Sequence, residues 1–341
     1  MKIINAMFSK VNGGLEQSFL NYTPALTMQG NQVIQVIHPE SEIKDSCPKG
    51  RLVLVHNYNQ YDPFAIRKLR KLIQSEEPQA IITHSYRAAY LFKKTKTKVP
   101  RIAVCHVRSQ YDFGADAIIA LTDSMRNDII QAGHPEHTVF TVPNMISIPE
   151  GLNYHPPKPS EIPVIGACAR FSDIKGIDVF IEALALLKKR NIAFKANIAG
   201  DGKEKERYIN LIQHHQLQQE ITLLGWINDK QAFYNGIDLF CLPSREESFG
   251  LVILESMMHS VPMVLTELSG PLEIMGNTES ALLVPPSDPV SMANALERLI
   301  KDNALAKLVS RNAFERVHYY SNQNIGPILQ NVLNTVCRPG Y

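Results

Sequence analysis

Two glutamates eight residues apart carry the clearest chemical signal in the chain. Glu247 and Glu255 flank the stretch Ser248-Phe249-Gly250-Leu251-Val252, which has the pattern of a loop, a glycine turn and the first turns of a helix. Eight positions are about two helical turns, so both carboxylates can point to one side. The first backbone N–H groups of a helix lack intrahelical partners and can hold a phosphate or sugar oxygen. The segment indicates a site for an anionic, hydroxyl-rich ligand.

A second cluster of chemistry-bearing residues follows an expected strand. Arg170 and Lys175 lie in the pattern R-x-x-x-x-K-G, which Gly176 completes. Two cations at a strand's carboxyl end suit a diphosphate, because arginine supplies a planar fork of donors and lysine a point charge. An ordinary surface pair of basic residues is the alternative.

The glycines support phosphate binding only weakly. Gly13 and Gly14 follow the first expected strand and open a helix, where backbone can approach a phosphate closely. Most glycine pairs only make a tight turn. The nicotinamide pattern G-x-G-x-x-G is absent at this point, and Gly200-Asp201-Gly202 lacks its third glycine, which disfavours a dehydrogenase.

Alternating apolar runs and amphipathic segments predict the elements that position these residues. In the first half, strands are expected at 3–8, 32–37, 52–56, 80–83, 101–107, 117–120 and 139–142, with helices at 15–29, 62–75, 86–93 and 124–132. In the second half, strands are expected at 164–169, 193–199, 221–223, 239–242, 263–266 and 281–284. Helices there are expected at 176–190, 203–215, 230–237, 251–258, 290–301, 304–317 and 322–336. This βαβα order predicts an α/β protein with parallel sheets covered by helices on both faces.

Length also favours two domains, because 341 residues exceed what one hydrophobic core usually supports. The segment 151–163 contains four prolines and few core residues, so it is the expected linker. We expect a first domain at 1–155, a second at 156–318, and a helix at 319–341 that returns to the first. A cleft between two such domains would hold ligands at the carboxyl ends of the strands.

Composition excludes several protein classes. No apolar run is long enough to cross a membrane, and the N-terminus does not resemble a signal peptide, so a cytoplasmic location is expected. Five cysteines without a C-x-x-C pair argue against a disulfide framework or a zinc site. The net charge is +2, but the window 67–101 holds ten Lys and Arg against two Glu. This window is a solvated helix face or a surface for an anionic membrane or acidic acceptor.

Together these motifs resemble those of retaining glycosyltransferases of family four, which have the GT-B fold of two Rossmann-like, doubly wound domains facing a deep cleft. Four features match in order over most of the chain. They are Gly13-Gly14-Leu15-Glu16, Arg170 to Gly176, Ala199-Gly200-Asp201-Gly202, and the E-x7-E segment with Phe249-Gly250 inside it. The E-x7-E element in its P-S-x-x-E-x-F-G setting is specific, whereas the glycine motifs are not.

The resemblance implies roles for these residues. Arg170 and Lys175 would neutralise the diphosphate of the donor, and the backbone at Gly14 would contact phosphate from the facing domain. Glu255 would accept hydrogen bonds from the ribose hydroxyls, and Glu247 with the amides from Phe249 to Val252 would hold the sugar and distal phosphate. The base would lie near Gly200 and Trp226-Ile227.

Two histidines end expected strands of the first domain. His106 matches the family histidine beside the donor sugar, and His84 is a weaker candidate for contact with the acceptor. A hydrogen-bonded structural histidine is the alternative for both, and it is favoured for His84.

The expected activity is metal-independent transfer of a hexosyl group from a UDP- or GDP-sugar to a glycolipid, oligosaccharide or polysaccharide, for example lipopolysaccharide core. The family's route has the leaving phosphate accept the acceptor's proton, so Glu247 need not form a covalent bond. A loop-and-helix carboxylate pair fits a hydrolase poorly. A sugar-nucleotide epimerase of the same fold and a non-catalytic sugar-nucleotide binding protein remain as alternatives. No cofactor and no nucleic-acid partner are expected, and the basic window gives a possible peripheral contact with the inner face of the cytoplasmic membrane.

Overall fold

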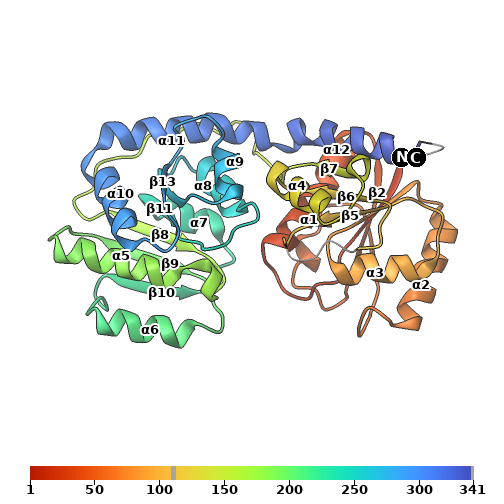
Figure 1. The fold of residues 1–341 in the computed structure, drawn as a ribbon, viewed down its shortest axis with the longest axis horizontal. Helices are drawn as coiled ribbons and strands as arrows, with labels where there is room; N and C mark the ends of the chain where they lie inside the picture. Colours follow the sequence, from red (N-terminus) through yellow and green to blue (C-terminus); the bar gives the residue numbers. More distant parts are fainter. Residues whose placement is uncertain (109–112, 339–341) are drawn as a thin grey trace. The chain divides into compact units, whose positions relative to one another are not determined.

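A computed structural model of the chain describes residues 1–108 and 113–338, which form two compact units. The first unit comprises Met1–Ser147 with the segment from Tyr319, of which 319–338 are described, and the second comprises Ile148–His318. Each unit holds one parallel sheet with helices on both faces, which is the predicted α/β class (Figure 1).

The first unit contains a seven-stranded parallel sheet in the order β3-β2-β1-β4-β5-β6-β7. Its strands are β1 (Lys2–Ala6), β2 (Gln32–Ile37), β3 (Arg51–Leu54), β4 (Ala80–Thr83), β5 (Arg101–Cys105), β6 (Ala117–Ala120) and β7 (Val139–Thr141). Its helices are α1 (Gly14–Met28), α2 (Pro63–Glu76), α3 (Tyr86–Thr95), α4 (Asp123–Gln131) and α12 (Asn322–Val336), with short 3-10 turns at Lys44–Ser46, Glu136–Thr138 and His318–Tyr320.

Alternation along the strands explains why both faces of this sheet are covered. Ile4 and Phe8 at β1 pack into one apolar cluster with residues of α2 and α3, whereas Met7 packs into another with Phe19 of α1. Successive strand side chains point to opposite faces, so a strand buried on both sides is apolar over most of its length. The continuous apolar runs in the sequence are therefore the signature of this doubly covered sheet.

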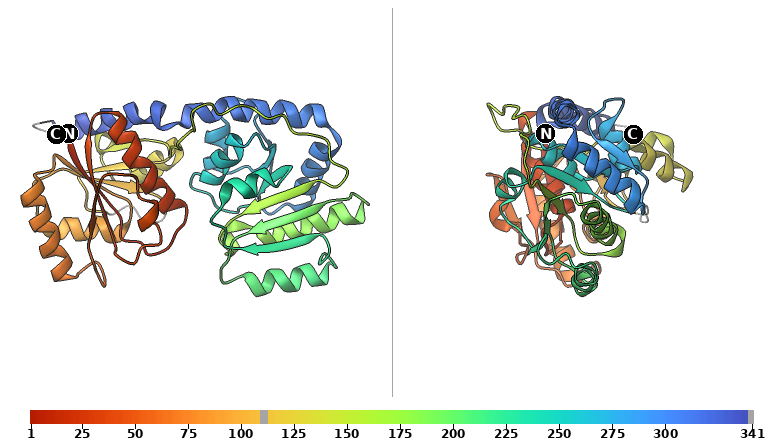
Figure 2. Two further views of the ribbon diagram at one scale, coloured as in Figure 1. Left: turned by 180° about the vertical axis from the view of Figure 1, so that it is seen from behind. Right: turned by 90° about the vertical axis from the view of Figure 1, so that its left-hand side faces the viewer.

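The second unit contains a six-stranded parallel sheet in the order β10-β9-β8-β11-β12-β13. Its strands are β8 (Val164–Cys168), β9 (Lys195–Ala199), β10 (Ile221–Gly225), β11 (Leu239–Leu242), β12 (Met263–Thr266) and β13 (Leu282–Val284). Its helices are α5 (Ile177–Lys189), α6 (Lys205–His214), α7 (Lys230–Asn235), α8 (Leu251–Met258), α9 (Ser269–Met275), α10 (Pro289–Lys301) and α11 (Asn303–Val317), with a 3-10 turn at Asp173–Lys175. Helix α5 packs between α6 and α10, and α8 packs against α11 (Figures 1 and 2).

Polar caps set most helix starts in the chain. Asp62 begins α2 by accepting hydrogen bonds from the amides of Phe64 and Ala65, and Pro63 occupies the first helical position. Side-chain caps also begin α3, α4, α7, α10, α11 and α12. Helices α1, α5 and α8 begin instead at Gly13, Gly176 and Gly250, without a side-chain cap among the described residues.

The predicted elements differ from the observed ones in a few places. Helix α9 was missed, because Ser269-Gly270-Pro271 at its start is typical of a loop. The strand predicted at 101–107 ends at Cys105, where pairing with β6 stops. The prediction was too long because the apolar run continues beyond that point.

The boundary between the units falls at residue 147, eight residues before the expected one. The reason lies in the contacts of the segment that follows: the Tyr154 hydroxyl donates to the Lys307 carbonyl at 3.0 Å, and the His155 amide donates to Ser260 Oγ at 3.1 Å. These contacts attach the first part of the proline-rich segment to the second unit.

The chain re-enters the first unit alongside the point where it left. Ile146 donates its amide to the Tyr320 carbonyl at 2.9 Å, and Asn322 donates to the Ile146 carbonyl at 3.2 Å. Helix α12 then packs against α1 (Figure 2). Ile325, Leu329 and Leu333 of α12 are fully buried.

Gly326 allows this close approach of α12 to α1, because a Cβ atom there would lie 3.1 Å from the Ala25 carbonyl oxygen. We expect Gly326→Leu to lower the free energy of unfolding of the first unit by about 1 to 3 kcal/mol through overpacking. The measurement is urea unfolding followed by circular dichroism. Gln323→Leu, at an exposed position of the same helix, is the control. Equal stability of both variants would contradict the role given to Gly326.

Candidate active site

Parallel strand order brings four predicted segments of the second unit to one edge of its sheet. Ile227 follows β10, Gly200 follows β9, Arg170 follows β8 and Glu247 follows β11, and these strands are neighbours in that order. Because carboxyl ends of parallel strands share one edge, residues far apart in the sequence become adjacent here. The Gly200 amide donates to the Gly225 carbonyl at 2.8 Å, which ties two of these ends together.

Lys175 and Glu247 form an ion pair at this edge. Lys175 Nζ lies 2.7 Å from Glu247 Oε2, and their side chains are 23% and 12% exposed. Lys175 ends the 3-10 turn that precedes α5, and Glu247 lies in the loop between β11 and α8. An ammonium group has three N–H donors, so one bond to Glu247 orients Lys175 and leaves two donors for a ligand.

Glycine is required where these segments start their helices. Gly176 and Gly250 adopt left-handed conformations, with φ of +62° and +102°. A Cβ atom at Gly176 would lie 2.0 Å from the Pro243 carbonyl oxygen, so only glycine lets the loop before α5 approach the end of β11. The predicted amide segment contains a buried Phe249 and a half-buried Ser248, with Leu251 and Val252 in the first turn of α8.

Glu255 lies on α8 and has its own partners, which the sequence did not reveal. Lys230 Nζ lies 2.5 Å from Glu255 Oε1, and the Tyr234 hydroxyl donates to Oε2 at 3.0 Å. Both partners come from α7, at positions i and i+4 of one helix face. The i, i+4 spacing of Lys230 and Tyr234 was the only signal of this contact in the sequence, and it does not show that α7 lies beside Glu255.

Burial affects the groups around Glu255. Desolvation, followed by the charge of Glu255, raises the pKa of Tyr234 well above its ordinary value. Desolvation and the same carboxylate raise the pKa of the Cys168 thiol to about 12. Both groups are therefore neutral near pH 7, and the Tyr234 hydroxyl remains a hydrogen-bond donor to Glu255.

Arg170 is exposed beyond β8, and its side chain has no hydrogen bond or ion pair within the described residues. Its guanidinium is therefore available to a ligand at the edge where Lys175 lies. Gly200 is buried and adopts φ +136°, and a Cβ atom there would lie 1.8 Å from the Ala169 carbonyl oxygen. This close packing by itself accounts for glycine at position 200.

In the first unit, predicted residues follow three neighbouring strands. Gly13 and Gly14 come after β1, His84 after β4 and His106 after β5, in the sheet order β1-β4-β5. His84 Nδ1 lies 3.2 Å from His106 Nε2, and the two rings stack with centroids 5.4 Å apart. His84 is fully buried, with its ring edge-on to Tyr22 at 4.4 Å.

Both histidines are neutral at physiological pH. Desolvation lowers the pKa of His106 to about 3, and desolvation with the charge of His106 lowers the pKa of His84 well below its ordinary range. In such a pair one ring nitrogen donates and the other accepts. Nothing in the sequence indicated that the two histidines interact, whereas in the structure they form a hydrogen-bonded pair.

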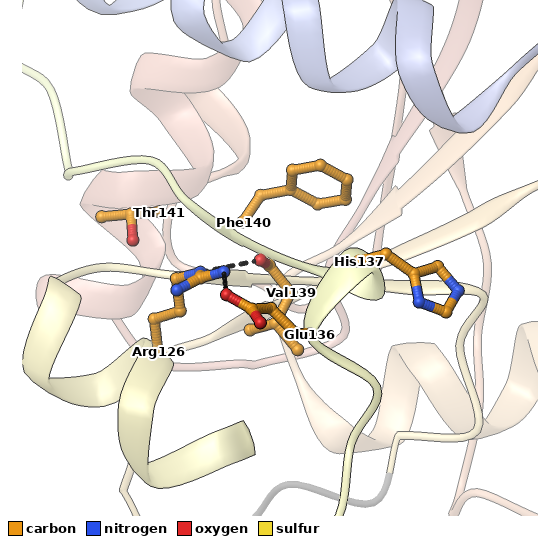
Figure 3. Close-up of a pocket in the computed structure, with 6 residues that line it drawn as sticks. All are labelled: Arg126, Glu136, His137, Val139, Phe140 and Thr141. Atoms are coloured by element: carbon orange, nitrogen blue, oxygen red, sulfur yellow. Dashed lines mark hydrogen bonds and ion pairs between the residues drawn. The ribbon is translucent and has the colours of Figure 1, made fainter.

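Other polar clusters lie outside the predicted residues. A surface hollow at α4 and β7 is lined by Arg126, Glu136, His137, Val139, Phe140 and Thr141 (Figure 3). Arg126 there already donates to Glu136 and to the Val139 carbonyl. At the ends of β2 and β3, His38, Glu40 and His56 have ligand atoms within 4.8 Å of one another, but Lys10 pairs with Glu40 at 2.6 Å and the Glu40 amide donates to His38 Nδ1.

Known protein families and relatives match nearly the whole chain. The family model described as Glycosyltransferase Family 4 matches residues 12–148, and the one described as Glycosyl transferases group 1 matches residues 155–316. The lipopolysaccharide core biosynthesis glycosyltransferase LpsE of Rhizobium meliloti is 25% identical over 334 residues, which cover 95% of this chain and 96% of LpsE. The capsular polysaccharide biosynthesis glycosyltransferase CapM of Staphylococcus aureus is 29% identical over 50% of this chain and 46% of its own.

The chain is a glycosyltransferase. Solved structures agree on the fold: Anabaena HepE, in complex with UDP-glucose, superposes with a TM-score of 0.85 over 98% of this chain and all of its own, at 19% identity. The sucrose-phosphate synthase of Thermosynechococcus elongatus gives a TM-score of 0.81 over 98% of each chain, at 18% identity. The predicted GT-B fold, with two Rossmann-like domains, is confirmed.

The neutral histidines make the glycosyltransferase sensitive to acid. A histidine with a lowered folded-state pKa stabilises the fold fully above its unfolded-state pKa of about 6.5, and this stability is lost as the pH falls toward 3. We expect the free energy of unfolding to fall by up to about 1.4 kcal/mol per pH unit for each such histidine between pH 6.5 and pH 4.

Thermal unfolding at pH 7.0 and 5.0 measures this loss. His106→Gln should reduce the loss between the two values, whereas His155→Gln, at an exposed position, should leave it unchanged. The same loss in wild type and His106→Gln would show that His106 is not held neutral in the fold.

Proposed function

We propose that the enzyme is a retaining member of glycosyltransferase family four that moves a hexosyl group from a nucleoside diphosphate sugar to a glycan acceptor. The observation that carries this proposal is the edge of the second sheet, where Arg170 and the Lys175–Glu247 pair lie beside glycine-started helices. HepE, which shares the fold, is described with bound UDP-glucose, which supports a UDP-sugar as donor.

The site chemistry fits departure of a nucleoside diphosphate. As the glycosidic bond breaks, positive charge develops on the sugar and negative charge on the diphosphate. Arg170 and the free donors of Lys175 would neutralise that diphosphate, and the amide dipoles at the start of α8 would add to their effect. No metal ion is needed for this charge balance. The acceptor hydroxyl oxygen would bond to the anomeric carbon on the face that the phosphate leaves, and the departing phosphate would accept the hydroxyl proton, so the anomeric configuration is retained.

The carboxylates have orienting roles in this proposal. Glu247, paired with Lys175, would accept hydrogen bonds from the sugar hydroxyls. Glu255 already accepts from Lys230 and Tyr234, yet a carboxylate has about four lone-pair sites, so it can also accept from ribose hydroxyls. The base would lie near Gly200 and Ile227, and in the first unit Gly14 would contact phosphate and His106 the donor sugar.

The acceptor is proposed from the relatives. LpsE is named for lipopolysaccharide core biosynthesis and CapM for capsular polysaccharide biosynthesis, so a cell-surface glycolipid or polysaccharide precursor is the proposed acceptor. For an enzyme that acts on such precursors, the proposed location is the cytoplasm, at the inner face of the membrane.

The test is nucleotide release from a panel of UDP- and GDP-sugars, with and without glycolipid acceptors and with a chelator present. Transfer predicts release that requires the acceptor, survives the chelator and gives a product with the donor's anomeric configuration by NMR. Conversion of the donor without an acceptor would indicate an epimerase. Thermal shifts without turnover would indicate a binding protein, and no consumption of any donor would overturn the proposal.

Lys175 and Glu255 should affect different steps. We expect Lys175→Ala to lower kcat by about 10² to 10³-fold, because a cation aimed at the leaving phosphate acts mainly in the transition state. Glu255→Ala should weaken UDP binding about tenfold with a smaller change in kcat. The single tryptophan, Trp226, is 49% exposed beside the proposed base site, so its fluorescence reports UDP affinity.

Glu246→Ala is the matched control for both substitutions, because Glu246 is the exposed neighbour of Glu247. It should leave kcat and UDP affinity near their wild-type values. Wild-type turnover in Lys175→Ala together with wild-type UDP affinity in Glu255→Ala would reject this assignment of the site.

The proposed membrane contact gains support from the surface of α2 and α3, which pack side by side (Figure 1). None of the described helices is long and apolar enough to cross a bilayer. Within residues 1–108 and 113–338, no carboxylate lies within ion-pair distance of the cations of this surface, which are Arg67, Lys68, Arg70, Lys71, Arg87, Lys93, Lys94, Lys96 and Lys98. Phe64 in the first turn of α2 is 81% exposed, and Tyr58 in the loop before α2 is 80% exposed. Unpaired cations beside exposed aromatic side chains suit an anionic lipid surface.

Vesicle sedimentation tests this contact. Binding to vesicles with phosphatidylglycerol should exceed binding to pure phosphatidylcholine and should fall with salt, since each cation near an anionic surface contributes about 1 kcal/mol. Arg67→Glu with Lys71→Glu should weaken binding by tenfold or more. Lys188→Glu with Lys189→Glu, in the second unit, is the charge-matched control. Equal binding to both vesicle types would exclude the electrostatic contact.

A further inference from the structure

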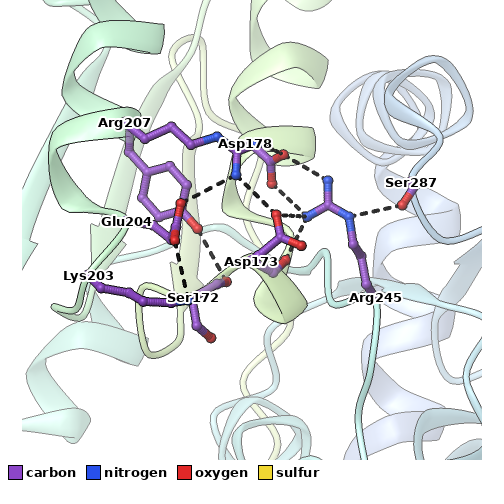
Figure 4. Close-up of polar contacts among 9 residues, drawn as sticks. Ser172, Asp173, Asp178, Lys203, Glu204, Arg207, Arg245 and Ser287 are labelled. Atoms are coloured by element: carbon purple, nitrogen blue, oxygen red, sulfur yellow. Dashed lines mark hydrogen bonds and ion pairs between the residues drawn. The ribbon is translucent and has the colours of Figure 1, made fainter.

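Four charged side chains tie together the two loops that carry Lys175 and Glu247. Asp173 and Asp178 flank Lys175 in the first loop and the start of α5, Arg245 precedes Glu247 by two residues, and Arg207 comes from α6 (Figure 4). Each arginine contacts both aspartates. This cluster is separate from the Lys175–Glu247 pair, but it lies on the same two segments.

Asp178 is the centre of the cluster. Its side chain is only 7% exposed, and its two oxygens accept from Arg245 Nη1 at 2.9 Å and Nη2 at 2.7 Å. Arg207 Nη2 donates to the same carboxylate at 2.8 Å. Burial acts to raise the pKa of Asp178, but the hydrogen bond and charge of Arg245, with the charge of Arg207, leave it lowered. A two-pronged bond to a buried carboxylate fixes the plane of the guanidinium as well as its distance.

Arg245 also holds the first loop through backbone groups. Its amide donates to the Ile174 carbonyl at 2.8 Å, and its Nη1 donates to the Asp173 carbonyl at 2.6 Å. Ile174 directly precedes Lys175. Side-chain and main-chain bonds of one residue therefore fix the spacing between the loop of Lys175 and the loop of Glu247.

Arg245 is not available to bind a ligand itself. Its Nε donates to Ser287 Oγ at 3.1 Å, its Nη1 to Asp173 O and Asp178 Oδ1, and its Nη2 to Asp178 Oδ2. These bonds use four of the five N–H donors of a guanidinium. Any effect of Arg245 on the reaction must therefore act through the residues that it positions.

Arg207 offers a matched comparison. It pairs with Asp173 at 3.0 Å and with Asp178 at 2.8 Å, so it shares the same carboxylates. Arg207 also pairs with Glu204, which lies near it at the start of α6. Among the described residues, Arg207 has no hydrogen bond or ion pair with the loop from Pro243 to Glu247. Removing Arg207 disturbs the same acids without releasing the loop of Glu247.

We propose that Arg245 is a positioning residue that holds Glu247 against Lys175 by clamping its loop onto Asp178 and the backbone of residues 173–174. The proposal deepens the proposed function, because it rests on Lys175 and Glu247 as the pair that meets the donor. Without the Arg245 side chain, the two loops keep the Lys175–Glu247 ion pair and the bonds from the Arg245 and Glu246 amides to the Ile174 carbonyl, but they lose the bonds to Asp178 and to the Asp173 carbonyl. The loop of Glu247 is then held less firmly, and the Lys175 ammonium loses its fixed direction.

The first test measures Lys175 directly and does not need activity. Amine acetylation under trace conditions, followed by mass spectrometry, gives the reactivity of each lysine relative to the exposed Lys98 in the same sample. The reagent must reach the amine nitrogen, and the ion pair with Glu247 shields the nitrogen of Lys175, whose side chain is 23% exposed. We expect Arg245→Ala to raise the relative reactivity of Lys175 roughly threefold or more, the effect of losing a partly buried ion pair. Arg207→Ala should leave it unchanged.

The second test is steady-state transfer with the best donor and acceptor. Arg245→Ala should lower kcat roughly 10 to 100-fold with a smaller change in the KM of the donor, because small misplacement of a catalytic cation affects mainly the transition state. Arg207→Ala should stay within about threefold of wild type. Arg245→Lys keeps the charge and the backbone bonds but loses the fork, so it should restore part of kcat.

The outcomes separate this proposal from the proposed function. If wild-type enzyme consumes no donor, the proposed function fails, and the reactivity of Lys175 still decides whether the clamp exists. If Arg245→Ala does not fold, Arg245→Lys and Asp178→Asn provide the same two readouts. Unchanged Lys175 reactivity in folded Arg245 variants, or an equal rise in Arg207→Ala, would overturn the clamp.

Discussion

Both sheets consist of parallel strand pairs, and this single constraint organises the rest of the glycosyltransferase. A parallel strand must return through a helix, so every loop that follows a strand emerges at the same edge. In the second unit this edge collects the ends of β10, β9, β8 and β11, which lie far apart in the sequence. The helices that begin there direct their positive ends toward the same edge. Charge at this edge therefore depends on the strand order and on the residues that follow each strand.

The charges at the edge of the second sheet are arranged in fixed pairs. Glu247 is held by Lys175, and Glu255 by Lys230 and Tyr234. A carboxylate with a fixed hydrogen-bonding partner keeps its direction, which suits the orientation of hydroxyl groups. The cluster of Arg245 and Asp178 connects the loops, and within it only the Asp178 carboxylate, 7% exposed, is buried. The region thus has one set of charged pairs proposed to meet a ligand and a second set that keeps the loops in register.

The edge of the first sheet has a different character. His84 and His106 end neighbouring strands as a neutral, hydrogen-bonded pair, and Gly13 starts α1 without a side-chain cap among the described residues. Neutral rings and backbone amides can contact a sugar or phosphate without placing a second set of full charges there. Helices α2 and α3 carry exposed cations that have no ion-pair partner among the described residues. The two units therefore differ in electrostatics although they share one architecture.

The local sequence pattern was sufficient to predict the fold and the residues that follow each strand. Strands β2, β4, β6, β11 and β12 and helices α8 and α12 have the predicted bounds, because a doubly covered strand is apolar over most of its length and a packed helix must repeat its apolar face. The E-x7-E segment and the Arg170 to Gly176 segment were recognisable from residue type and spacing alone. Helix α9 was not predicted, because the glycine and proline at its start are typical of a loop and outweigh the helical pattern of its apolar residues.

The partners of these residues were decided by the tertiary structure. Nothing in the sequence pairs Lys175 with Glu247, Glu255 with α7, or Arg245 with Asp178, because these contacts depend on which strands are neighbours and how closely their loops approach. The histidine pair arises in the same way from the adjacency of β4 and β5. Periodicity is a property of ten or so consecutive residues, whereas an ion pair between distant loops exists only after the sheet has ordered its strands. The sequence by itself determined which residues reach the edge of each sheet, and the tertiary structure determined which of them meet.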